Sequence, residues 1–129
     1  MTNELSLLAW SVVLGLVHIF IAAAAVTRVR GLAWNVSARD GAPAPLTGIP
    51  ARLVRAQANF FETFPLFAAL VLAVVVGGHT DAQTLLGAQL YLGARVVYLP
   101  LYAAGIPYLR SLAFGVAIVG LVMLLRALF

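Results

Sequence analysis

The polar residues best placed to do chemistry lie within one short stretch in the first half of the chain. Arg55, Asn59 and Glu62 recur at i, i+4 and i+7, a spacing that places them on one face of a helix, and Arg52 extends that face by a turn. Gln57 would lie on the opposite side, about 200° from Arg55 at roughly 100° per residue. Arginine pairs with carboxylates through two parallel hydrogen bonds, and a glutamate can accept from an ammonium group. The stretch therefore indicates a site for a zwitterionic or anionic molecule.

A second polar stripe follows later in the chain. Its members recur at i, i+4, i+7 and i+11 and are Tyr91, Arg95, Tyr98 and Tyr102. Tyrosine hydroxyls can donate hydrogen bonds to a ligand, and Arg110 opens the next apolar segment. The pattern also allows a purely structural interpretation, in which Glu62 pairs with Arg55 or Arg95 and the network only holds helices together. From spacing alone, both interpretations stay open.

The composition identifies the environment of these residues. Of 129 residues, 64% are hydrophobic and only 9% are charged, whereas soluble domains are about 25% charged. The chain is therefore predicted to be an integral membrane protein, in which charged groups face a protein interior or a polar cavity. All eight basic residues are arginines that do not cluster as a DNA-binding patch, so no nucleic-acid partner is expected. The absence of cysteine excludes a thiol nucleophile, and two histidines near opposite membrane sides support no metal site.

Four apolar segments are long enough to cross a bilayer and predict an all-α, four-helix transmembrane bundle. Their expected bounds are residues 5–27, 52–76, 82–104 and 108–128. Pro65 and Pro100 fall inside the second and third segments and would kink them. A signal peptide is the competing interpretation of the first segment, but the arginines follow that segment rather than precede it.

The charge distribution predicts how the chain is oriented in the membrane. Residues 28–55 hold five arginines and one aspartate, a net charge of +4, which is typical of a cytoplasmic loop. Both termini are therefore expected outside, and nearly every costly polar residue would converge on the inner leaflet. Within the loop, glycines and prolines would break helices, and Trp34 would anchor at the interface. Arg39-Asp40-Gly41 would form a turn with a local ion pair.

Two motifs resemble those of a known family. The pattern R-x-x-R-A-Q-x-N-x-x-E-x-x-P-x-F, from Arg52 to Phe67, resembles the second-helix signature of the MAPEG family, the membrane-associated proteins of eicosanoid and glutathione metabolism. The A-R-x-x-Y-x-x-x-Y stretch at Ala94–Tyr102, the four segments and Arg110 agree with this resemblance. It covers essentially the whole chain as one domain, 1–129, and looks closest to small bacterial members.

The resemblance implies a homotrimer that binds glutathione between neighbouring subunits, near the cytoplasmic side of a bacterial inner membrane. The glutathione contacts that it implies are Arg55, Asn59, Glu62, Tyr98 and Tyr102, with Gln57 donated by the neighbouring subunit. Arg110 matches the family's arginine that stabilises the glutathione thiolate. Further candidates for the site are Arg52, Arg28, Arg30 and Arg95. Thr63 stands where some members have a tyrosine.

The implied activity is that of a glutathione-dependent transferase or peroxidase acting on lipophilic electrophiles that arrive from the bilayer. Glutathione would be a co-substrate, no metal would be needed, and the partners would be the bilayer, other copies of the chain and a lipophilic small molecule. Two alternatives are a related protein that has lost the chemistry and only binds a ligand or partner, and a small proton-coupled exporter. The exporter is disfavoured because the first span contains no acidic residue.

Overall fold

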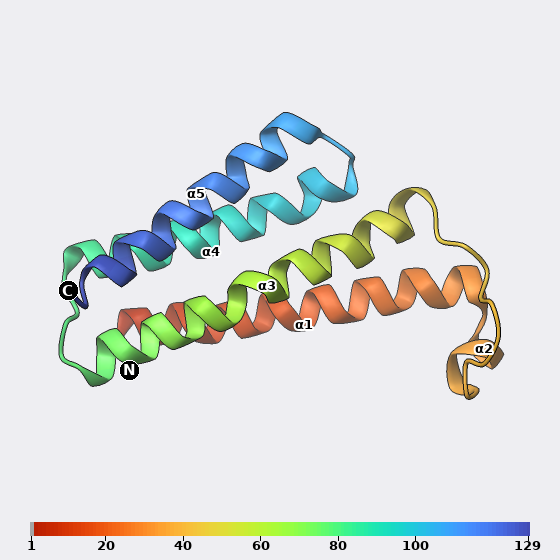
Figure 1. Cartoon of the computed structure of the whole chain (residues 1–129), viewed down its shortest axis with the longest axis horizontal. Coiled ribbons are helices and arrows are strands. Elements are labelled where there is room, and N and C mark those ends of the chain that lie inside the picture. The colour runs from red at the N-terminus through yellow and green to blue at the C-terminus, as the bar shows by residue number, and fades with distance from the viewer. Residues whose placement is uncertain (1) are drawn as a thin grey trace.

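The computed structural model describes residues 2–129, and all the regular structure within them is helical. Residue 1, which the predicted domain includes, lies outside this range. Four helices are long and one is short (Figure 1). Their bounds are α1 Asn3–Arg30, α2 Leu32–Val36, α3 Gly48–Val76, α4 Ala82–Ala103 and α5 Pro107–Arg126.

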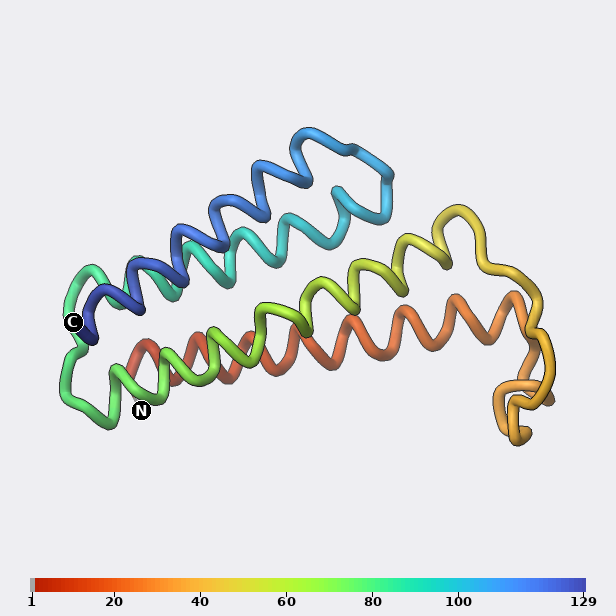
Figure 2. Tube along the Cα trace, in the orientation of Figure 1, coloured from red at the N-terminus to blue at the C-terminus, as the bar shows by residue number. Residues whose placement is uncertain are grey.

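The long helices form two antiparallel pairs. Figure 1 shows α1 beside α3 and α4 beside α5, with both ends of the chain at the same end of the molecule. The trace in Figure 2 shows the two pairs diverging toward the other end, where α3 begins and α4 turns into α5. The beginning of α3 and the α4–α5 connection therefore face each other across the place where the pairs separate.

Length and composition support an integral membrane protein. The helices α1, α3 and α5 are each long and apolar enough to cross a bilayer. The fourth long helix, α4, has 22 residues but is more polar, because it carries Arg95, two glutamines and three tyrosines. The prediction of four spanning segments is thus supported for three of them, and α4 packs against these three.

The buried face of α3 places the polar stripe at the edge of the core. The buried residues recur at helical spacing and are Ala56, Phe60, Thr63, Phe67, Val71 and Val74. In the polar stripe, Arg55, Asn59 and Glu62 each directly precede one of these buried residues, so the stripe is rotated from the buried face by about 100° around the helix axis. As a result Asn59 is half-buried, whereas Arg55 and Glu62 are exposed in the single chain.

Two glycines bring α4 and α5 into close contact. A Cβ atom placed on Gly87 would lie only 2.9 Å from the carbonyl oxygen of Gly120, so neither position has room for a larger residue. Small residues of this kind allow helices in membranes to approach closely. At Gly93 and Gly115, by contrast, a Cβ atom would meet nothing within 4 Å. The close pairing of α4 and α5 fixes the connection between them, which forms one wall of the site described below.

The connection between α1 and α3 differs from the predicted irregular loop. The helix α1 continues through Arg30, α2 follows Gly31, and α3 already begins at Gly48. Pro50 was expected to break a helix, but it lies in the first turn of α3. The N–H groups of the first turn have no partner within the helix, so a proline there costs no hydrogen bond. The helical spans therefore extend beyond the apolar segments at this end of the molecule.

Candidate functional site

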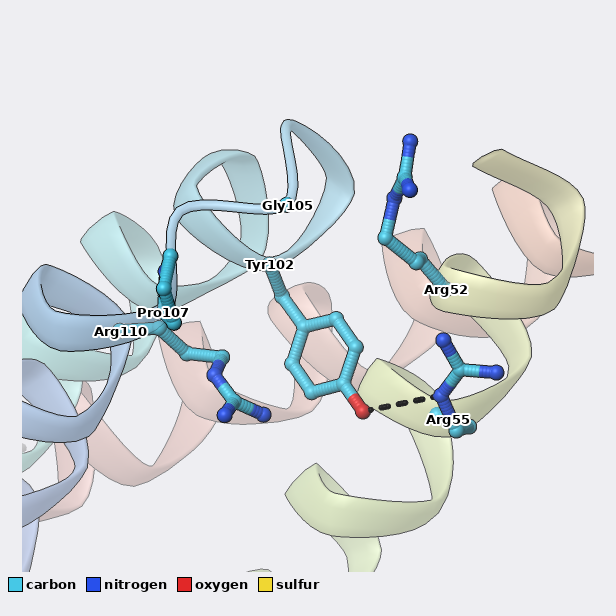
Figure 3. Close-up of a pocket in the computed structure, with 6 residues that line it drawn as sticks. All are labelled: Arg52, Arg55, Tyr102, Gly105, Pro107 and Arg110. Atoms are coloured by element: carbon cyan, nitrogen blue, oxygen red, sulfur yellow. Dashed lines mark hydrogen bonds between the residues drawn. The ribbon is translucent and has the colours of Figure 1, made fainter. Parts of the chain in front are cut away.

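A pocket of about 340 Å³ lies between the start of α3 and the α4–α5 connection. The residues that line it are Arg52, Arg55, Tyr102, Gly105, Pro107 and Arg110. Gly105 has φ +76°, a conformation that L side chains rarely adopt, and the turn there places α5 directly after α4. Arginines from two helix pairs thus line one space: Figure 3 shows Arg55 and Arg110 on either side of Tyr102, and Arg52 directed away from the tyrosine, beside Gly105.

Tyr102 lines this pocket between Arg55 and Arg110. Its hydroxyl oxygen accepts a hydrogen bond of 3.2 Å from Nε of Arg55. On the other side, the guanidinium carbon of Arg110 lies 4.8 Å from the centroid of the Tyr102 ring (Figure 3). Both contacts are favourable, because an aromatic face attracts a cation and a hydroxyl oxygen accepts from an N–H. The tyrosine therefore holds two guanidinium groups on either side of the pocket.

The pocket carries a concentrated positive charge. Arg52 uses its Nε to donate to the carbonyl oxygen of Ala103 at 3.0 Å, which ties the start of α3 to the end of α4. Of the described residues that line the pocket, none is acidic. Like charges this close repel one another, and an anion bound among them would relieve the repulsion. The arrangement favours a ligand with one or more carboxylates, which guanidinium groups bind through paired hydrogen bonds.

A smaller pocket of about 150 Å³ lies next to the first and shares Arg110 with it. The other residues that line it are Asn59, Tyr98, Ser111 and Phe114. Arg110 therefore lies where it can reach a ligand that extends from the larger pocket into the smaller one. Ser111 was not predicted from the sequence, although its place directly after Arg110 near the start of α5 could have suggested it.

Arg95 lies behind the smaller pocket and is fully buried. Its Nη1 donates to Oδ1 of Asn59 at 2.7 Å, and its guanidinium carbon lies 4.1 Å from the centroid of the Tyr98 ring. Arginine has only donors, so Asn59 must turn its oxygen toward Arg95. The amide NH₂ of Asn59 is then left to donate to a group inside the pocket.

The structure brings together five of the residues predicted for ligand binding or catalysis, but not all of them. Those that meet at the two pockets are Arg55, Asn59, Tyr98, Tyr102 and Arg110, joined by Arg52 and, behind them, Arg95. Glu62 is exposed and Gln57 half-buried on α3, and neither lines a pocket described above. The alternative in which Glu62 pairs with Arg95 is wrong for the single chain, because Nη1 of Arg95 binds Asn59 and its other two nitrogens have no hydrogen-bond partner within residues 2–129.

Arg28 and Arg30 lie away from the arginine pocket, at the end of α1. Arg28 borders an apolar pocket between α1 and α3. Arg30 donates from Nε to the carbonyl oxygen of Ala44 at 3.0 Å and lies over the ring of Trp34. Within a single chain, neither contributes to the space around Tyr102.

Comparison with known protein families shows which family the chain resembles. The family model described as "MAPEG family" matches residues 7–129, nearly the whole chain. The chain belongs to the MAPEG family. This membrane family includes glutathione transferases and related enzymes. No curated protein matches the chain closely enough to be assigned as a relative. The resemblance carried by the α3 motif is thus confirmed at the level of the family.

Proposed function

We propose that this MAPEG protein is a glutathione-dependent transferase or peroxidase that acts on lipophilic electrophiles dissolved in the bilayer. The observation that supports this function best is the pocket lined by Arg52, Arg55 and Arg110, in which Arg55 and Arg110 lie on either side of Tyr102 and no lining residue is acidic. Glutathione carries two carboxylates and one ammonium group at neutral pH, so its net charge suits this pocket. A guanidinium group would hold each carboxylate with two parallel hydrogen bonds.

Each residue has a distinct task in this proposal. Arg52 and Arg55 would bind the carboxylates, and the amide NH₂ of Asn59 would donate to a carbonyl or carboxylate oxygen. Arg110, which borders both pockets, would lie beside the sulfur. An opposite charge nearby favours the thiolate over the thiol and lowers the thiol pKa below the ordinary value of about 8.5. With an electrophilic carbon, the thiolate would form a carbon–sulfur bond while a leaving group departs with its electron pair, or, on a conjugated double bond, while the resulting carbanion takes up a proton. With a lipid hydroperoxide, the thiolate would attack the outer oxygen, the O–O bond would break, and the alcohol would leave. A second glutathione would then convert the sulfenic acid to the disulfide and water.

Assembly would complete the site. Glu62 is exposed and Gln57 only half-buried in the single chain, so both could meet glutathione that is held between two subunits. Glu62 would accept from the ammonium group of glutathione, which would balance part of the positive charge of the arginines. We propose a homotrimer, as the family resemblance implies, with both termini outside and residues 28–55 in the cytoplasm.

The role of Arg110 can be tested by following thiolate formation. Bound thiolate is measured by ultraviolet difference absorbance as the pH is raised, with purified protein in detergent. In the wild-type protein, bound glutathione should ionise at a lower pH than free glutathione. Arg110→Ala should bring the thiol pKa back toward 8.5 and reduce turnover more than affinity. Arg126→Ala is the matched control, because Arg126 is exposed at the other end of α5.

The outcomes separate the proposed enzyme from the silent alternative. If glutathione binds the wild-type protein but titrates as it does in free solution, the activating role of Arg110 is wrong. If glutathione binds and ionises but no electrophile or peroxide is consumed, the protein is a binding-only member of the family.

A further inference from the structure

Away from the arginine pocket, two arginines and a tryptophan form a second cationic site at the end of α1. The guanidinium carbons of Arg30 and Arg39 lie 5.1 Å and 5.6 Å from the centroid of the Trp34 ring. The two cations therefore share one indole and are at most about 11 Å apart. We call Arg30, Trp34 and Arg39 the interfacial cluster.

The interfacial cluster is held in place by neighbouring polar groups. Arg39 donates from Nε to the carbonyl oxygen of Asn35 at 3.0 Å and from Nη2 to Oδ1 of the same residue. Asn35 in turn donates from Nδ2 to the Thr27 hydroxyl of α1 at 3.1 Å. The expected ion pair between Arg39 and Asp40 is replaced by these bonds to Asn35. Arg39 is thereby fixed to the end of a membrane-spanning helix rather than left on a loose loop.

The arginines keep unused donors that can reach a ligand. Arg30 uses Nε for the carbonyl oxygen of Ala44, and Arg39 uses Nε and Nη2 for Asn35. Within residues 2–129, both terminal nitrogens of Arg30 and Nη1 of Arg39 have no hydrogen-bond partner. These donors, together with two positive charges, suit the oxygens of a phosphate group.

Apolar side chains beside the cluster suggest where that phosphate comes from. Leu32 and Val36 of the short helix α2 are 67% and 75% exposed, and Ile49 at the start of α3 is 55% exposed. Leu32 and Val36 follow closely on the end of α1, which is long and apolar enough to cross a bilayer. Exposed leucine and valine next to arginine and tryptophan are typical of a segment that lies in the membrane interface.

We propose that the interfacial cluster binds the phosphate of an anionic phospholipid headgroup, with α2 lying in the membrane interface beside it. The charge of the cluster complements the lipid, and the apolar side chains of α2 would contact the upper acyl chains. Each arginine near a charged membrane surface favours an anionic lipid about fivefold, so two together should enrich it roughly 30-fold. This inference does not depend on glutathione binding.

Trp34 can report on the lipid directly, because bromine on an acyl chain quenches indole fluorescence only at short range. Trp10 lies near the other end of α1 and is exposed, so Trp10→Phe leaves Trp34 as the only indole. The protein is placed in nanodiscs that hold the same fraction of brominated lipid. Both sets contain phosphatidylglycerol and phosphatidylcholine. In one set the bromine is on phosphatidylglycerol and the phosphatidylcholine is unlabelled, and in the other set the bromine is on phosphatidylcholine and the phosphatidylglycerol is unlabelled.

We expect stronger quenching of Trp34 when the bromine is on phosphatidylglycerol. Arg39→Gln should lower the preference about fivefold, whereas Arg126→Gln, which changes an exposed arginine at the end of α5, should leave it unchanged. Equal quenching in the two sets would overturn the proposal. Loss of the preference on adding millimolar glycerol phosphate would also overturn it, because the ligand would then be a soluble phosphate ester.

Native mass spectrometry gives a second readout. Phosphatidylglycerol should stay bound to the wild-type protein and dissociate from Arg39→Gln. Equal retention of the lipid by both proteins would contradict the assignment.

Discussion

The hydrogen bond between Arg95 and Asn59 lets one residue be tested for two separate roles. Asn59 accepts from a fully buried arginine at 2.7 Å, so its oxygen is used for structure and its NH₂ is left for the ligand. Asn59→Ala removes both groups. Asn59→Asp keeps an acceptor for Arg95 and adds an opposite charge, but it has no donor for glutathione. The two substitutions should therefore affect stability and binding differently.

The expected magnitudes follow from these contacts. A hydrogen bond to a charged group contributes about 1.5–3 kcal/mol, so Asn59→Ala should lower the free energy of unfolding by that amount. Asn59→Asp should be at least as stable as the wild-type protein. In both variants, loss of one donor to a charged ligand should weaken glutathione binding about 10- to 150-fold. The weaker binder should be Asn59→Asp, because its carboxylate also repels the carboxylates of glutathione.

Two assays in the same detergent separate the roles of Asn59. Thermal unfolding followed by circular dichroism reports on the bond to Arg95, and calorimetry reports on glutathione. Asn3→Ala is the control, because Asn3 is exposed at the first residue of α1. If Asn59→Ala unfolds as the wild-type protein does, the bond to Arg95 does not stabilise the fold. If Asn59→Asp binds glutathione with unchanged affinity, the amide NH₂ does not contact the ligand.

Three further predictions concern the pocket, the helix packing and the topology. Tyr102→Phe removes the hydroxyl that accepts from Arg55, so glutathione binding measured by calorimetry should weaken by about 2- to 10-fold; an unchanged affinity would show that this bond does not position Arg55. Gly120→Ala should lower the unfolding temperature, because α4 and α5 would have to separate, whereas Gly115→Ala should leave it unchanged. Equal unfolding temperatures of the two variants would refute the close approach of α4 and α5 as a source of stability. A cysteine at the exposed position of Ala42 should react with an impermeant reagent only in inside-out vesicles, and labelling of intact cells would reverse the predicted topology.

Helical periodicity in the sequence was sufficient to find most of the candidate site. The spacing of Arg55 and Asn59 on one helix, and of Tyr98 and Tyr102 on another, placed each pair on a single face, and the structure brings the two faces together. Periodicity worked because it depends only on the geometry of one helix. The motif from Arg52 onward also identified the family correctly.

Periodicity could not show which partner a side chain meets on a neighbouring helix. Glu62 was a plausible partner for Arg95, but the rotation of α3 turns it outward and turns Asn59 toward the arginine. That rotation depends on how large residues such as Phe60 and Phe67 pack, which is set by all the helices together. The short helix α2 was missed for another reason, because five residues carry too little periodic signal to be distinguished from a loop.

Calorimetric titration of glutathione into the purified protein tests the central claim most directly. The wild-type protein should bind glutathione saturably, and Arg55→Ala should weaken the binding at least tenfold, because the pocket loses a guanidinium group that would pair with a carboxylate. Arg126→Ala should bind as the wild-type protein does. No saturable binding to the wild-type protein, or equal binding to Arg55→Ala, would contradict the assignment of the arginine pocket as the glutathione site.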